Sequence, residues 1–260
     1  MSRKCRAKPA SPFRCFNSSP EVIRLVVLMY VRFPLSLRNV EDLLFERGID
    51  VSHETVRFWW NRFGPLFAGD IRRQRVSAMR GFRHWRWHLD EVYVKINGEV
   101  HYLWRAVDHE GEVLESFVTK TRDKAAALTF MKKALKRHGS PEAITTDGLR
   151  SYGAAMSELG NADKREVGRW ANNRVENSHL PFRRRERAML RFRQMKSLQK
   201  FASVHANVHN HFNLRIASLE LLPNVEVLPH LKCSRAMVAW EQADEENEHG
   251  DAGGAGSGDG

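Results

Sequence analysis

One acidic residue interrupts a stretch that otherwise has the composition of a β-strand. Residues 84–96 are rich in aromatic and β-branched side chains, and Asn97 and Gly98 behind them favour a two-residue hairpin turn. Asp90 lies inside this stretch, where a carboxylate weakens the strand and costs desolvation free energy unless a positive charge lies beside it. A bound metal ion would supply that charge, whereas a solvated position at a frayed edge would need none. The strand alone leaves both interpretations open.

Two further carboxylates could join Asp90. Asp147 ends a short expected strand, and side chains at the C-terminal ends of parallel strands collect at one edge of an α/β sheet. If that strand lies beside the Asp90 strand, the two carboxylates repel each other unless a divalent cation neutralises them. Glu176 falls in the first turns of a later helix that could pack over the sheet. Three carboxylates without a His or Cys partner favour Mg²⁺ or Mn²⁺, and a pair of such ions supports phosphodiester displacement.

The elements that must position these carboxylates form an α/β pattern. The hydropathy patterns predict, in order, strands over 84–96, 100–107 and 112–119, a helix over 123–138, a strand over 143–146, a helix over 151–159 and a long helix from about 172. The first three strands form an antiparallel meander, and 160–170 is a variable stretch. Trp85 and Trp87 share one face of the first strand, which favours core packing over base stacking.

Three short helices precede the strands. They are expected over about 20–33, 36–47 and from Ser52 onward, with Gly48 in the tight turn, and they resemble a helix-turn-helix unit. In this interpretation Val56, Trp60 and Phe63 pack inward while the polar residues of the third helix face DNA. Those polar residues are His53, Glu54, Arg57, Asn61 and Arg62. The alternative is a helical subdomain that only supports the core.

The charge distribution points to a polyanionic partner. Residues 241–260 hold 7 acidic residues and no Lys or Arg, so 1–240 combine 42 basic with 24 acidic residues, a net charge of +18. Nucleic acid is favoured over a membrane, because no basic amphipathic helix with a bulky apolar face and no bilayer-spanning run stands out. We therefore expect a cytoplasmic protein. The three cysteines match no zinc or disulfide pattern.

Four ordered blocks resemble the Asp-Asp-Glu transposases of bacterial insertion sequences, and insertion-sequence family six most of all. They are His88–Lys95, Tyr102–Asp108, Ile144–Asp147 with Ser151–Gly153, and Asn172–Asn177. The similarity covers about residues 20–215. It implies an α/β fold: a ribonuclease-H-like mixed sheet flanked by helices, preceded by a small helix-turn-helix domain.

The resemblance also implies a site and a reaction. Asp90, Asp147 and Glu176 would be the catalytic metal ligands, holding two Mg²⁺ or Mn²⁺ ions. Arg183, seven residues after Glu176, would contact DNA phosphate. The helix-turn-helix unit would bind the terminal inverted repeats. Water would cleave at the element's 3′ end, and the freed 3′-hydroxyl would attack target DNA, with a homodimer or higher oligomer assembled on the DNA in the nucleoid.

Basic residues beside the expected site have two interpretations. Arg184 and Arg187, in the run that begins at Arg183, could form a solvated helical face, but next to the carboxylates we expect them to contact phosphates. His205 and His209 stand four apart on an expected helix, yet no accompanying Glu completes a zinc motif. We expect these two histidines to pack or to lie at the surface.

One feature departs from the family pattern. Only 28 residues separate Asp147 from Glu176, fewer than is usual in the family, and we expect a shortened loop around 160–168. Glu158 and Glu166 are rivals for the third ligand, although neither has the flanking Asn-Asn-Arg-Val frame. The shorter gap also keeps two alternatives open: a catalytically inactive DNA-binding relative that represses transposition, and a general metal-dependent nuclease.

The expected domain organisation has six parts. They are a basic flexible arm over 1–19, the helix-turn-helix domain over 20–67, a linker or connecting helix over 68–82, the catalytic domain over 83–215, a C-terminal extension over 216–240 and a disordered acidic tail over 241–260.

Overall fold

A computed structural model describes residues 11–78, 86–167, 173–189 and 192–220. Met1–Asn213 form one compact unit and Leu214–Gly260 a second, and every contact discussed below lies within the first. Most of the expected arm, all of the acidic tail, the end of the linker and Trp85 lie outside the described residues. None of the helices in the described ranges combines the length and hydropathy that crossing a bilayer requires.

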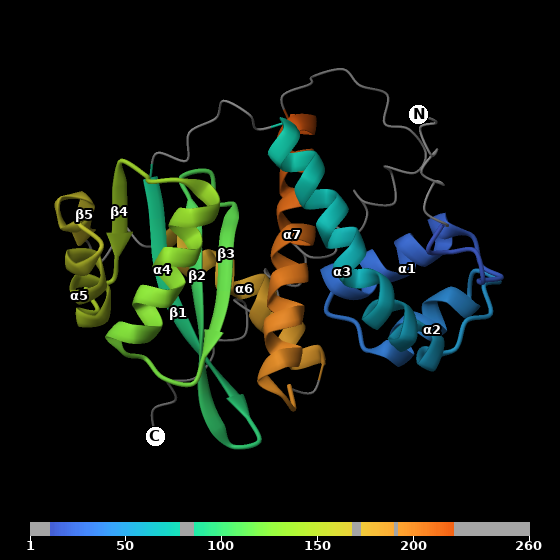
Figure 1. Cartoon of the computed structure of the whole chain (residues 1–260). Helices are drawn as coiled ribbons and strands as arrows, with labels where there is room; N and C mark the ends of the chain where they lie inside the picture. Colours follow the sequence, from blue (N-terminus) through green and yellow to red (C-terminus); the bar gives the residue numbers. More distant parts are fainter. Residues whose placement is uncertain (1–10, 79–85, 168–172, 190–191, 221–260) are drawn as a thin grey trace, which may run out of the picture. The chain divides into compact units, whose positions relative to one another are not determined.

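Residues 86–167 contain one mixed five-stranded sheet with the order β3-β2-β1-β4-β5 (Figure 1). Its strands are β1 Arg86–Ile96, β2 Glu99–Asp108, β3 Val113–Thr119, β4 Ala143–Thr146 and β5 Arg165–Val167. The first three strands are antiparallel neighbours, whereas β4 runs parallel to β1 and β5 parallel to β4. The meander and the parallel placement of the short strand beside β1 are therefore confirmed.

Local sequence explains the first turn and the crossover helix. Asn97 and Gly98 have φ values of 51° and 88°, and positive φ at both central residues is what the expected hairpin turn requires. Asp123 caps the helix α4 Lys124–His138, because its side chain accepts a hydrogen bond from the Ala126 N–H at 2.8 Å. This helix carries the chain from the end of β3 to β4, so β4 can lie parallel to β1.

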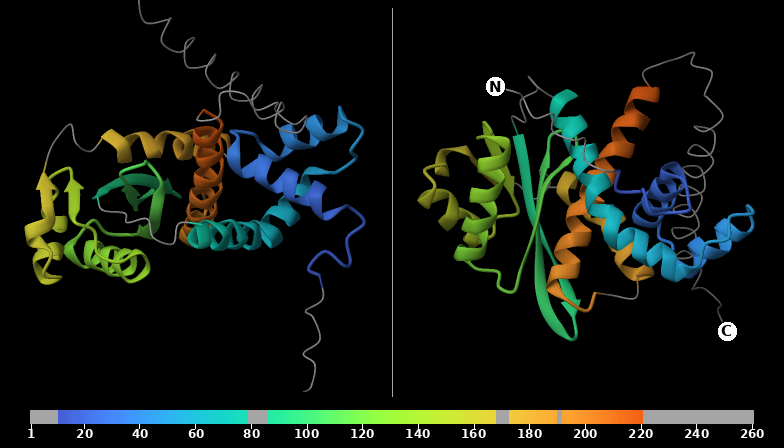
Figure 2. Two further views of the ribbon diagram at one scale, coloured as in Figure 1. Left: turned by 90° about the horizontal axis from the view of Figure 1, so that it is seen from above. Right: turned by 45° about the vertical axis from the view of Figure 1, so that its right-hand side comes forward.

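Helices cover both faces of the sheet (Figure 2). On one face α4 and the helix α5 Arg150–Glu158 bury a core that contains Trp87, Leu89, Trp104 and Phe130. On the other face the helix α6 Asn173–Ala188 contacts β1 and β2. The helix α7 Met195–Glu220 contributes Phe201 to a separate apolar core, which also contains Phe182 of α6 and Val94 of β1. Since successive strand residues point to opposite faces, Asp90 belongs to the α6 face and Glu91 to the α4 face.

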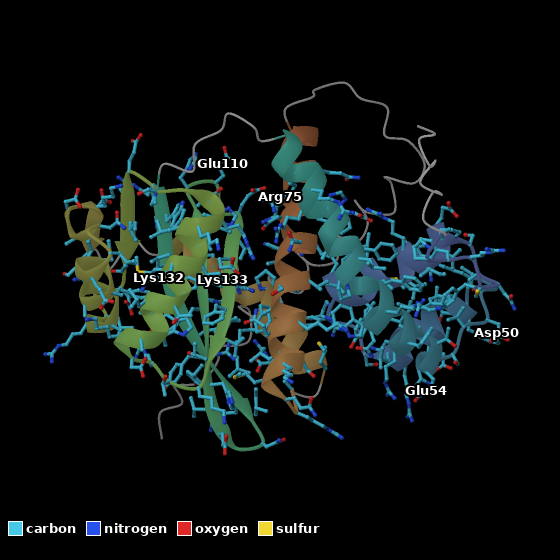
Figure 3. All side chains as sticks on the ribbon, in the orientation of Figure 1. Asp50, Glu54, Arg75, Glu110, Lys132 and Lys133 are labelled. Carbon is cyan, nitrogen blue, oxygen red and sulfur yellow. The ribbon has the colours of Figure 1, made fainter. Side chains whose placement is uncertain are left out.

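The N-terminal helices are α1 Pro20–Arg32, α2 Leu37–Phe45 and α3 His53–Ala78. Ser52 accepts a hydrogen bond from the Thr55 N–H, as expected of a helix cap. Val56, Trp60 and Phe63 are buried, which confirms the predicted inward face. Helix α3 continues through Ala78, so most of the expected linker is the second half of this helix. There Arg75, labelled in Figure 3, pairs with Glu112, the residue before β3.

Two parts of the C-terminal pattern differ from expectation. The stretch expected to be a shortened loop, 160–168, holds a 3-10 turn, Ala162–Lys164, and the edge strand β5. Three strand residues are too few for an alternating pattern to be visible in the sequence. The long helix expected from about 172 is two helices, α6 Asn173–Ala188 and α7 Met195–Glu220.

Candidate active site

The register of the sheet brings Asp90 and Asp147 together. β1 and β4 pair in parallel with Leu89 opposite Thr146. Asp90 follows Leu89 and Asp147 follows Thr146, so the two aspartates are neighbours across the two strands. Asp147 follows the last residue of β4, and its Oδ1 accepts a hydrogen bond from the Leu149 N–H at 3.0 Å. The predicted neighbourhood of the two carboxylates is therefore confirmed.

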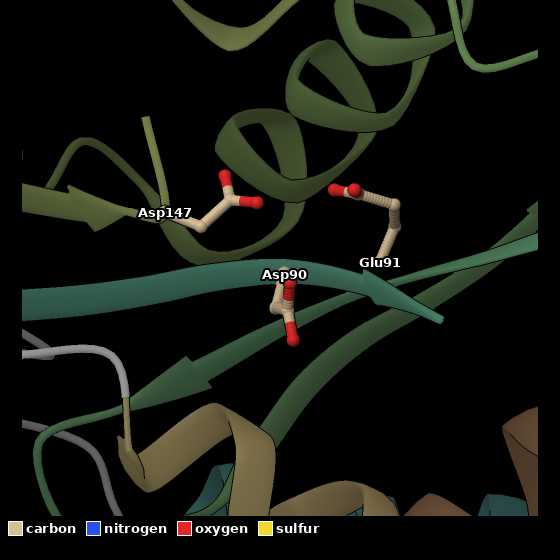
Figure 4. Close-up of side chains that lie close together, drawn as sticks. All are labelled: Asp90, Glu91 and Asp147. Carbon is tan, nitrogen blue, oxygen red and sulfur yellow. The ribbon is translucent and has the colours of Figure 1, made fainter. Parts of the chain in front are cut away.

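Glu91 completes an acidic cluster that the sequence reasoning missed. One carboxylate oxygen from each of Asp90, Glu91 and Asp147 lies within 4.8 Å of the others. In Figure 4 the side chains of Asp90 and Glu91 leave β1 on opposite sides, with Asp147 at the adjoining end of β4. Strand alternation suggested that Glu91 points away from the site.

The side chain of Glu91 is almost fully buried, and only one of its two carboxylate oxygens has a polar partner within the described residues. Its side chain is 2% exposed, and it pairs with Arg122 in the loop before α4. Arg122 also lies 3.8 Å from the carboxylate of Asp147. The Oε2 atom of Glu91 is buried and has no hydrogen-bond partner within the described residues. A buried carboxylate oxygen without a partner is unfavourable, and a cation would relieve that cost.

Burial and mutual repulsion perturb these acids. Burial raises the pKa of Asp90 to about 6, and the charge of Asp147 adds to the rise. Burial likewise raises the pKa of Glu91 to about 7, although the Arg122 guanidinium opposes the change. Raised carboxyl pKa values mean that the ionised forms are disfavoured in the metal-free protein. The oxygen donor set and its excess negative charge fit a hard divalent cation such as Mg²⁺ or Mn²⁺.

Helix α6 brings two more polar groups to Asp90. The Nε2 atom of His179 lies 3.2 Å from the Oδ2 atom of Asp90. Arg105, directly opposite Asp90 on β2, is fully buried and donates a hydrogen bond to the carbonyl of Ser178. Burial lowers the pKa of His179 to about 2, with a further contribution from the charges of Arg105 and Arg183, so its ring is neutral. Neither Arg105 nor His179 was predicted.

The third predicted ligand, Glu176, lies on α6, and its side chain is outside the described part of the chain. Its role therefore stays a prediction. The two rivals are engaged elsewhere. Glu158 pairs with Lys124 at 2.8 Å and Glu166 with Arg86 at 3.2 Å. Neither rival belongs to the described acidic cluster.

The basic run of α6 divides into exposed and structural residues. Arg183 stacks over the ring of Tyr93 at 5.3 Å and donates hydrogen bonds to the Tyr93 carbonyl and to Glu186. Arg184 is half-buried and Arg187 exposed. Arg185 is buried, and its Nε atom donates to the Tyr30 carbonyl at 2.7 Å, so this member of the run is not a phosphate contact. It ties α6 to α1.

The predicted DNA-facing residues of α3 share one surface. Arg57, Asn61 and Arg62 are exposed, and His53 is half-buried. Several already have partners: Arg57 pairs with Glu54 at 2.9 Å, His53 with Glu41 at 2.8 Å, and Asn61 accepts from Lys200. Phe58, which the sequence reasoning did not single out, is 51% exposed on the same helix.

His205 and His209 were expected either to pack or to lie at the surface, and the structure shows that both are buried. His205 and His209 stack on each other with ring centroids 5.9 Å apart, and His205 also meets the rings of Phe182 and Phe201. No described carboxylate cluster includes them.

The sheet order, with the acidic cluster where β4 ends beside β1, is that of a ribonuclease-H-like fold. A family model described as a DDE domain matches residues 84–214. The transposase for the insertion sequence-like element IS431mec of Staphylococcus aureus is 33% identical over 172 residues, which cover 64% of this chain and 75% of that protein. The transposase for insertion sequence element IS257 in transposon Tn4003 of Staphylococcus aureus is 32% identical over 172 residues, which again cover 64% of this chain and 75% of that protein. The chain belongs to the insertion-sequence family-six DDE transposases.

Relatives and solved structures extend the comparison. An uncharacterised protein of Methanocaldococcus jannaschii is 29% identical over 193 residues, which cover 74% of this chain and 84% of that protein. The Mos1 transposase catalytic domain is 17% identical, covers 58% of this chain and 88% of its own, and has a TM-score of 0.36. The catalytic core domain of BIV integrase is 14% identical, and the match covers 48% of this chain and 81% of the integrase chain, with a TM-score of 0.34.

Proposed function

We propose that this chain is an active transposase that binds the terminal inverted repeats of its insertion sequence, cleaves the DNA strand at the element's end and joins that end to target DNA. The observation that carries the proposal is the meeting of Asp90, Glu91 and Asp147 within 4.8 Å at one edge of the sheet. Clustered carboxylates of which two are largely removed from solvent are costly, and a protein that only bound DNA would have no use for them.

The site residues have distinct proposed roles. Asp90, Asp147 and Glu176 would hold the divalent ions, and Glu91 lies close enough to the first two to assist. Bound divalent ions of this kind lower the pKa of a hydroxyl and neutralise charge on the scissile phosphate. Arg183, Arg184 and Arg187 would orient the DNA by contacts with phosphates, which position a duplex without reading its sequence.

The protein would work on double-stranded DNA as a homodimer or higher oligomer, in the cytoplasm and on the nucleoid. The strongly basic body formed by residues 1–240 supports a DNA partner. The α3 surface formed by His53, Arg57, Asn61 and Arg62 would recognise the inverted repeats, because the last helix of such a unit commonly enters the major groove.

The assay that tests this function is transfer of a labelled element end into plasmid DNA, with Mg²⁺ and with EDTA. We expect joined products with Mg²⁺ and none with EDTA. Binding of the ends without any cutting would support the repressor alternative instead, and cutting without joining would support the nuclease.

Arg57→Ala should weaken binding to the element's ends about 10-fold or more, and binding to random DNA much less, because a base contact contributes roughly 1–3 kcal/mol of discrimination. Arg73→Ala is a matched control, since Arg73 also lies on α3 and also pairs with an acid three residues earlier, Asp70. Fluorescence anisotropy on both DNAs measures the effect. Equal losses on the two DNAs would contradict the recognition role of α3.

A further inference from the structure

His179 occupies an unusual place beside the acidic cluster. Its side chain is 8% exposed, and its Nε2 atom lies 3.2 Å from Oδ2 of Asp90. This contact is not a hydrogen bond, and neither ring nitrogen has a hydrogen-bond partner within the described residues. A buried polar side chain normally finds such partners. His179 therefore directs an unsatisfied nitrogen toward a proposed metal ligand.

The spacing of the two atoms suits a pair of ligands of one ion. Oxygen and nitrogen ligands lie about 2.0–2.2 Å from ions of this class. Two ligands at right angles around such an ion are then separated by roughly 3 Å. The 3.2 Å between Nε2 and Oδ2 agrees with that separation, and the pair does not form a hydrogen bond.

The sequence of α6 gives independent support. Glu176 stands three positions before His179, and residues three apart lie on the same side of a helix. A Glu-x-x-His arrangement on one helix can therefore present a carboxylate and an imidazole to the same metal, as in helical di-metal carboxylate sites. Helix α6 is held at this place by the hydrogen bond from Arg105 to the carbonyl of Ser178, next to His179.

We propose that His179 is a nitrogen ligand of the divalent ion held by Asp90. This inference rests on the proposed function and deepens it, because it makes the donor set a mixture of carboxylate oxygen and imidazole nitrogen. Imidazole favours later transition metals over Mg²⁺, so the site should bind Mn²⁺ more tightly than Mg²⁺. Replacing His179 with glutamine should weaken Mn²⁺ binding at least about tenfold and reduce this preference.

The test is pulsed electron paramagnetic resonance of the full chain loaded with Mn²⁺. A directly bound imidazole gives a ¹⁴N coupling, which we expect in the unaltered protein and not in His179→Gln. His101→Gln is the matched control, because His101 is also buried and lies on β2 four residues from Arg105. This control should keep the coupling. Unchanged thermal unfolding of the metal-free variants establishes that they fold.

The outcomes separate the inference from the function on which it rests. Mn²⁺ that binds with no ¹⁴N coupling in the unaltered protein would overturn the ligand role of His179 and leave the transposase proposal intact. A coupling that persists in His179→Gln would overturn it as well. No Mn²⁺ binding at all, in protein whose folding is confirmed, would count against the metal-dependent function itself.

Discussion

Asp147→Asn should abolish DNA strand cleavage while leaving binding to the element's ends nearly unchanged. Asp147 follows β4 beside Asp90, and in the proposed mechanism it shares in holding the divalent ions. Loss of that charge removes several kcal/mol of transition-state stabilisation, which corresponds to a fall in rate of at least about a thousandfold. Gel assays of cleavage and of end binding measure the two effects separately.

The substitution should not unfold the protein. An asparagine at this position keeps an oxygen that can accept the hydrogen bond from the Leu149 N–H. It also removes repulsion among Asp90, Glu91 and Asp147, so the melting temperature of the metal-free variant should equal or exceed that of the unaltered protein. Asp163→Asn, at an exposed position outside the cluster, is the control and should cleave normally. A cleaving Asp147→Asn variant would exclude Asp147 from catalysis.

Trp104→Ala should lower the melting temperature by about 10 °C. Trp104 is fully buried on β2 between the sheet and α4, and its ring meets those of Phe130 and Tyr152. Its Nε1 atom also donates to the Thr119 hydroxyl at 2.7 Å. Truncating a buried Trp to Ala costs about 3–5 kcal/mol, and each kcal/mol corresponds to roughly 2–4 °C in a protein of this size.

This core position also supports the site, since Trp104 lies opposite Glu91 in the register of β1 and β2. Trp104→Ala should therefore weaken metal binding as well as stability. Val100→Ala, at a 42% exposed position on the same strand, is the control, and its unfolding free energy should stay within about 0.5 kcal/mol of the unaltered value. A Trp104→Ala variant with an unchanged melting temperature would contradict the described packing of this face.

The sequence predicted the β1–β4 edge of the site because each step rested on local chemistry. The turn at Asn97 and Gly98, the strand character around Asp90 and the short strand before Asp147 all left local signals, and the α4 crossover made a parallel β4 the natural arrangement. The adjacency of Asp90 and Asp147 follows from those elements. The helical pattern also placed Glu176 in the first turns of a helix, which is confirmed. Its role as third metal ligand, which the resemblance implies, stays a prediction.

The remaining site residues depend on tertiary packing that no local pattern contains. Glu91 belongs to the opposite face of β1 from Asp90, yet carboxylate oxygens of both lie within 4.8 Å of one from Asp147. His179 and Arg105 come to the site because α6 packs against β1 and β2, where Arg105 donates to the carbonyl of Ser178. Arg185 is indistinguishable in sequence from its exposed neighbours, although it is buried against Tyr30. Strand β5 is simply too short to leave an alternating pattern.

The measurement that tests the account most directly is strand transfer by Glu176→Gln in Mg²⁺, beside the unaltered protein, Glu158→Gln and Glu166→Gln. Joined products are expected from the unaltered protein and from both control variants, whose native glutamates pair with Lys124 and Arg86 outside the acidic cluster. No joined product is expected from Glu176→Gln, although this variant should still bind the element's ends. Full joining by Glu176→Gln, or no joining by the unaltered protein despite bound ends, would contradict the account.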